Sequence, residues 1–141
     1  MTNLQAALGL AQMERIDEII SHRQDLFSWY KEVINTSSEI RLNFSASWAK
    51  NVYWLISIEV DWFTDELRSE FMKGLKEKGI DSRPYFYPIS SMPMYQTRSL
   101  PVALKKSQVG INLPSYYKLT KEDVVLIGGA VNEVIDSLNS K

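Results

Sequence analysis

The fold class follows from residues 52–88, which read VYWLISIEVDWFTDELRSEFMKGLKEKGIDSRPYFYP. Apolar and polar side chains alternate over residues 52–60, which predicts a half-buried strand. A helix is expected next, because Thr64 is a good N-cap residue, acidic residues follow it and lysines gather toward its end. Residues 80–87 are a second strand candidate, which lies at a sheet edge or ends at Pro84 because proline donates no ladder hydrogen bond.

The flanking segments complete an α+β pattern. Residues 90–100 are expected to be a loop, followed by a short helix over 102–107 and a strand over 110–113. A last helix begins after Thr120. Its expected inward residues are Val124, Ile127, Val131, Val134, Ile135 and Leu138. We therefore predict helices packed on a small sheet, mixed or mostly antiparallel.

The N-terminal segment has helical periodicity over an unusual length. Residues 2–34 contain no proline and are predicted to form one long helix, with Ser21 as the expected kink if it bends. Such a helix is about 50 Å long, whereas a compact domain of this size is about 37 Å across. Either the helix bends, or its apolar end over 4–11 packs against a surface outside this chain. We divide the chain into a linking helix, 1–34, and a small α/β domain, 52–141.

Composition excludes several classes of function. The 141 residues are 45% apolar and 23% charged, which is typical of one globular core, and the net charge of −1 gives no footprint for nucleic acid or an anionic membrane. The absence of cysteine excludes thiolate metal sites and suits a reducing compartment such as the cytoplasm. A single histidine, His22, argues against a histidine metal cluster or a Ser-His-Asp site, and we interpret it as a solvated or hydrogen-bonded helix residue. We assign no metal ligand and no catalytic residue.

The strongest candidate site is the segment RPYFYP at residues 83–88. The guanidinium of Arg83 suits a phosphate or a carboxylate, and the neighbouring aromatic rings suit sugar hydroxyls or the plane of a base. An edge strand with aromatic packing, and with Arg83 in a surface ion pair, explains the same residues without a ligand. The residues alone leave the function open.

Three segments of this chain resemble DegT-type sugar aminotransferases. They are MTNLQAALGLAQ at 1–12, GIDSRPYFYP at 79–88 with PMY at 93–95, and GINLPS at 110–115 with LTKEDV at 119–124. Their order and spacing agree with that family over nearly the whole chain. The resemblance implies the small C-terminal domain of a fold-type I enzyme that uses pyridoxal phosphate. Such an enzyme transfers an amino group from glutamate to a 4-keto-6-deoxy sugar nucleotide.

The resemblance also implies roles for individual residues and partners. The substrate-binding residues would be Arg83, Tyr85, Phe86, Tyr87 and Ser90, where Ser90 stands in the place of a histidine in many relatives. In the family, the Schiff-base lysine belongs to a cofactor domain that precedes the position of Met1. We therefore expect a C-terminal fragment, inactive alone and without bound pyridoxal phosphate, that pairs with the missing domain and forms a homodimer through its N-terminal helix.

Two other classes of function remain open at this point. The first is a non-catalytic module, which would recognise a nucleotide sugar through Arg83, Tyr85 and Tyr87, or a protein through residues 4–11. The second is a structural fragment that self-associates because its helix end is uncovered.

Overall fold

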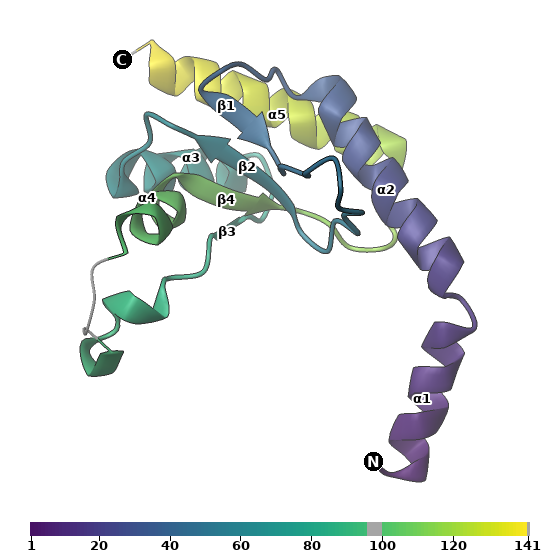
Figure 1. The fold of residues 1–141 in the computed structure, drawn as a ribbon. Helices are drawn as coiled ribbons and strands as arrows, with labels where there is room; N and C mark the ends of the chain where they lie inside the picture. Colours follow the sequence, from purple (N-terminus) through teal and green to yellow (C-terminus); the bar gives the residue numbers. More distant parts are fainter. Residues whose placement is uncertain (96–99, 141) are drawn as a thin grey trace.

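The computed structural model describes residues 1–95 and 100–140 and confirms the α+β class (Figure 1). In chain order, the elements are α1 (Asn3–Met13), α2 (Ile16–Val33), β1 (Ile40–Leu42), β2 (Ile56–Val60), α3 (Asp65–Glu77), β3 (Arg83–Pro84), the 3-10 turns η1 (Ile89–Ser91) and η2 (Pro93–Tyr95), α4 (Pro101–Val109), β4 (Gly110–Leu113) and α5 (Lys121–Asn139).

The sheet has four strands in the described residues, in the order β1-β2-β4-β3, and every neighbouring pair is antiparallel. β2 and β4 form its centre, where Ile58 lies opposite Ile111. β3 is a two-residue edge strand that ends at Pro84, as the proline predicts. In Figure 1, α5 lies along one face of the sheet, beside α2 and α3.

The core forms between this face and the helices. Ile56, Ile58 and Val60 of β2 point into it and are fully buried. All six inward residues predicted for α5 are buried. Gly128 lets α5 approach α2 closely, because a Cβ atom at this position would lie 2.5 Å from Cγ1 of Val33. The opposite face of the sheet carries Ser57 and Asn112, two buried polar residues.

The N-terminal helix differs from the prediction. It is divided into α1 and α2 by a break at Glu14 and Arg15, so the single helix over 2–34 and the kink near Ser21 are wrong. Tertiary contacts hold the start of α2, because Tyr117 hydrogen-bonds to Glu18 and lies within 3.4 Å of the Arg15 guanidinium. Every residue of α1 is nevertheless exposed, and Figure 1 shows this helix extending away from the sheet.

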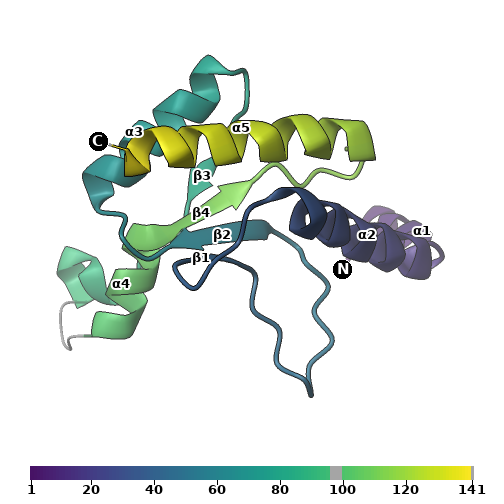
Figure 2. The same ribbon diagram turned by 90° about the horizontal axis from the view of Figure 1, so that it is seen from above.

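Other boundaries also differ from the sequence-based expectations. β1 is an additional strand, and the strand expected over 52–60 begins only at Ile56. Residues 43–55 instead form a long loop, which projects from the sheet in Figure 2. The expected strand over 80–87 is reduced to β3. Of the expected loop, the described part contains the turns η1 and η2, while positions 96–99 lie outside the described residues.

Candidate functional site

The structure brings four of the five predicted site residues to one cavity. Arg83, Tyr85, Phe86 and Tyr87 line a hollow of about 460 Å³ next to β3. The loop residue Trp54 closes it from another segment of the chain. Ser90 is half-buried in η1 and does not line this cavity.

A buried polar network supports the cavity from beneath. Ser57 Oγ donates a hydrogen bond to Asn112 Oδ1 at 2.8 Å, and Asn112 Nδ2 donates to the carbonyl oxygen of Pro84 at 3.3 Å. Burial raises the pKa of Tyr85 above its usual value, while a hydrogen bond with Ser57 acts in the opposite direction. Because these contacts join β2, β4 and β3, they hold the backbone before Tyr85 in place.

Gly110 determines where the Tyr85 ring lies. The ring packs directly over this glycine, and an added Cβ atom would lie 2.5 Å from Cε2 and closer still to Cδ2 and Cγ. The Tyr85 amide also donates to the Gly110 carbonyl oxygen at 3.0 Å. A side chain at position 110 would therefore displace Tyr85.

Arg83 lies at the outer rim of the cavity. Its guanidinium pairs with Asp81 at 3.1 Å, and both side chains are about three-quarters exposed. An exposed pair of this kind contributes little to stability, and the guanidinium retains further donors for an anion. The structure thus contains both features that would explain this segment without a ligand, the edge strand and the surface ion pair of Arg83. Neither feature prevents Arg83 from binding a phosphate.

Trp54 is the site residue that sequence reasoning missed. Alternation placed it on the inward face of a strand, but the side chain is 66% exposed and lies in the loop before β2. Its ring lies near that of Phe86, with centroids 6.5 Å apart and planes 15° from parallel. No local pattern could have found this pair, because the two residues meet only through the sheet.

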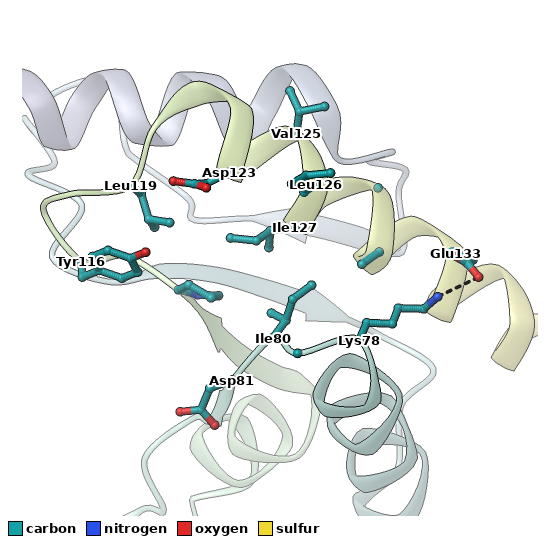
Figure 3. Close-up of a pocket in the computed structure, with 14 residues that line it drawn as sticks. Lys78, Ile80, Asp81, Tyr116, Leu119, Asp123, Val125, Leu126, Ile127 and Glu133 are labelled. Atoms are coloured by element: carbon teal, nitrogen blue, oxygen red, sulfur yellow. Dashed lines mark ion pairs between the residues drawn. The ribbon is translucent and has the colours of Figure 1, made fainter.

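A larger cavity of about 850 Å³ lies beside α5 (Figure 3). Apolar side chains such as Ile80, Leu119 and Leu126 line it, and Lys78 and Glu133 at its end pair with each other at 2.8 Å. The Asp123 carboxylate accepts a hydrogen bond from the Thr120 amide at 3.0 Å in the cap of α5. Because no predicted site residue lines this cavity, we do not choose it as the site.

His22 has a structural role. Its ring packs against Trp29 and Tyr117, with centroids 6.0 and 4.7 Å away. The residue is half-buried, and its Nε2 has no hydrogen-bond partner in the described part of the chain, so this nitrogen is neither solvated nor hydrogen-bonded as expected. The packing against Tyr117 is a long-range contact that helical periodicity does not encode.

The described residues do not fit a covalent pyridoxal phosphate site or a metal site. A lysine that forms a Schiff base needs a shielded pocket that lowers its pKa. All nine lysines within 1–95 and 100–140 are exposed, and several form ion pairs or hydrogen bonds at the surface. The same residues contain no group of three acidic, histidine or cysteine side chains that could hold a metal ion, and none of their helices has the length and hydrophobicity of a membrane span.

Comparison with known proteins identifies the family. The model of the DegT/DnrJ/EryC1/StrS aminotransferase family matches residues 1–132. This chain belongs to that family. It is 38% identical over 135 residues to GDP-perosamine synthase from Escherichia coli O157:H7, covering 94% of this chain and 36% of that protein. GDP-perosamine synthase from Caulobacter vibrioides is 32% identical over 139 residues, or 96% of this chain and 38% of that protein.

Solved structures confirm the fold of this chain. The putative sugar aminotransferase Spr1654 from Streptococcus pneumoniae, in its PMP form, superimposes with a TM-score of 0.88 at 24% identity, over 98% of this chain and 36% of that one. Helicobacter pylori PseC gives a TM-score of 0.84 at 22% identity, over 94% and 37% of the two chains. The chain therefore spans little more than a third of the length of these relatives. The predicted resemblance to DegT-type sugar aminotransferases is confirmed, and GDP-perosamine synthases are among the relatives of the chain.

Proposed function

We propose that this chain forms the substrate-binding C-terminal part of an enzyme that transfers an amino group from glutamate to a GDP-linked 4-keto-6-deoxy sugar. One observation carries the proposal: Arg83 and the aromatic residues 85–87 line one cavity, in a chain similar over its length to GDP-perosamine synthases.

Each side chain has a task in this proposal. Arg83 binds the diphosphate, because a guanidinium fork matches phosphate oxygens. Tyr85 and Tyr87 provide hydroxyl groups and ring faces that orient the sugar. The buried contacts of Ser57 and Asn112 keep this segment rigid, so that binding costs little ordering entropy.

Pyridoxal phosphate would provide the amino-transfer chemistry in the whole enzyme. Since no described lysine suits a Schiff base, we place the cofactor-binding part outside these 141 residues. We propose that this chain alone is inactive, that it binds no pyridoxal phosphate, and that it works with a cofactor domain in the cytoplasm.

A chimera tests this function. The matching C-terminal third of the Escherichia coli GDP-perosamine synthase is replaced by this chain, and formation of 2-oxoglutarate from glutamate is measured with a GDP-linked 4-keto sugar. We expect activity in the chimera and none in the 141-residue chain alone.

The matched pair of variants is Arg83→Ala and Arg15→Ala, because both guanidiniums are exposed but only Arg83 lines the cavity. The first is expected to raise KM for the sugar nucleotide at least tenfold, and the second to leave it unchanged. A folded chimera with no activity, or equal KM values for the two variants, would refute the proposal.

A second proposal concerns assembly through α1. Leu4, Leu8, Leu10 and Met13 of this helix are all more than three-fifths exposed, which is unusual for so many apolar side chains on one short helix. We propose that α1 is covered by a second copy of the chain, giving a homodimer. Light scattering is expected to show a dimer that Leu8→Lys converts to a monomer, while Gln12→Lys, a change to an exposed polar residue of the same helix, does not. A wild-type monomer at millimolar concentration would contradict it.

A further inference from the structure

The loop before β2 holds an exposed tryptophan on a fixed backbone. Arg23 of α2 donates a hydrogen bond to the Trp54 carbonyl oxygen at 2.9 Å. The same guanidinium donates to the Ser115 carbonyl oxygen at 2.6 Å, so it ties two loops to one helix. Asn43 Nδ2 donates to the Leu55 carbonyl oxygen at 3.0 Å, which fixes the residue that follows.

The residue before Trp54 is held in an unfavourable conformation. Tyr53 is the one described non-glycine residue with a positive φ, at 48°. A bulky residue rarely adopts this region, and the surrounding contacts must compensate for its cost. Here Asn51 Oδ1 accepts a hydrogen bond from the Tyr53 amide at 2.8 Å, and the Tyr53 ring stacks on Phe27 with centroids 3.8 Å apart. The next residue, Trp54, lines the cavity beside β3.

The spacing of Trp54 and Phe86 differs from that of a direct stack. The Phe27–Tyr53 centroids are 3.8 Å apart, whereas those of Trp54 and Phe86 are 6.5 Å apart with their planes 15° from parallel. Carbon atoms in contact lie about 3.5 Å apart, so one flat ring between two others separates them by about 7 Å. A sugar in a chair conformation is thicker than a flat ring and needs a wider gap. The centroid distance is an upper limit on the gap between the two planes, so these exposed rings must part by at least about 0.5 Å to take a planar aromatic group, and by more to take a sugar chair.

We propose that Trp54 and Phe86 sandwich the base of the nucleotide sugar, with Arg83 in the same cavity holding its diphosphate. The inference rests on the proposed function for the kind of ligand and adds Trp54 as a specificity-determining residue. Both rings are largely exposed, at 66% and 75%, so a base would bury aromatic surface that the chain leaves in water. The two rings therefore recognise the flat face of the base. Purines are expected to bind more tightly than the smaller pyrimidines, because they cover more of both rings.

The test titrates GDP and inorganic pyrophosphate into the 141-residue chain by calorimetry. Stacking on an aromatic side chain is lost when the ring is removed, so Trp54→Leu is expected to weaken GDP binding about tenfold to a hundredfold and to leave pyrophosphate binding unchanged. Trp54→Phe retains a ring and is expected to keep most of the affinity. Trp48→Leu is the matched control, because Trp48 belongs to the same loop, is 89% exposed and does not line the cavity. It is expected to bind GDP like the wild type.

A second measurement separates stacking from a change in folding. In the proton NMR spectrum, the H8 signal of GDP is expected to move upfield on binding, and the shift is expected to disappear in Trp54→Leu and Phe86→Leu. Absence of GDP binding to the wild type, or equal affinities for wild type and Trp54→Leu, would overturn the sandwich. The chimera assay tests the proposed function separately. If the chimera is active but GDP binding does not depend on Trp54, only the sandwich is refuted. If the chimera is inactive but GDP binding depends on Trp54, only the aminotransferase function is refuted.

Discussion

Gly110→Ala tests whether the contact between β4 and Tyr85 shapes the site. The new Cβ atom would lie 2.5 Å from Cε2 of Tyr85, whereas carbon atoms in contact lie about 3.5 Å apart, so the ring must move by about 1 Å. Gly110 has ordinary extended backbone angles, φ −97° and ψ 139°, which alanine adopts without strain. The whole effect is therefore steric, and overpacking of this kind costs about 1–3 kcal/mol.

Thermal unfolding followed by circular dichroism measures this cost. For a chain of this size, about 1 kcal/mol changes Tm by about 4 °C, so we expect Tm to fall by about 4–12 °C. Gly129→Ala is the control, because its added Cβ meets nothing within 4 Å in the helix α5, where alanine is favoured. In a Tyr85→Ala background, Gly110→Ala is expected to cost almost nothing, since the clashing ring is gone. A Tm within 1 °C of the wild type, or an equal cost in both backgrounds, would refute the reasoning.

Three further predictions concern the rest of the domain. Gly128→Ala, whose Cβ would lie 2.5 Å from Val33 Cγ1, is expected to destabilise the packing of α2 on α5 by about 1–3 kcal/mol in urea unfolding, and a neutral result would contradict the close approach. Tyr30→Phe removes the hydrogen bond that the hydroxyl of the buried Tyr30 donates to the Pro114 carbonyl oxygen at 2.8 Å. We expect the free energy of unfolding in urea to fall by about 0.5–1.5 kcal/mol, and unchanged stability would contradict this. The side chain of Glu18 is expected to titrate by NMR near pH 2, because hydrogen bonds from an arginine and a tyrosine lower its pKa to about 2. Because the pKa of Glu18 is lower in the folded chain than in the unfolded chain, its ion pair stabilises the fold above about pH 5, and this stabilisation is lost as the pH falls toward 2. A Glu18 titration midpoint near pH 4.3 would contradict the pairing.

The elements with strong local signals could be predicted from the sequence. Thr64 and Thr120 accept hydrogen bonds from backbone amides at the starts of α3 and α5, as their positions predict. Gly79 has a φ of 79°, which is the left-handed conformation expected of a helix stop. These features were predictable because each depends on residues three or four positions apart, whose chemistry is visible in the sequence.

The candidate site was predictable only in part. Arg83 and the aromatic residues 85–87 are consecutive, so composition was sufficient to single them out. Trp54 belongs to the same cavity but lies about thirty positions earlier, and its alternating neighbours favoured a strand interior instead. Ser90 is close in sequence to this segment and still lies outside the cavity, because η1 turns the chain away.

The sequence by itself determined the α+β class, the two capped helices, the edge position of β3 and the membership of an aminotransferase family. Only the tertiary structure decided where the N-terminal helix breaks and which aromatic rings face each other. Tyr117, about a hundred positions from Glu18, contacts the first turn of α2 next to the break, and Arg23 holds the backbone of Trp54, whose ring lies near that of Phe86. Local patterns report the preferences of neighbouring residues, whereas these contacts gain their energy only after the sheet has brought distant segments together.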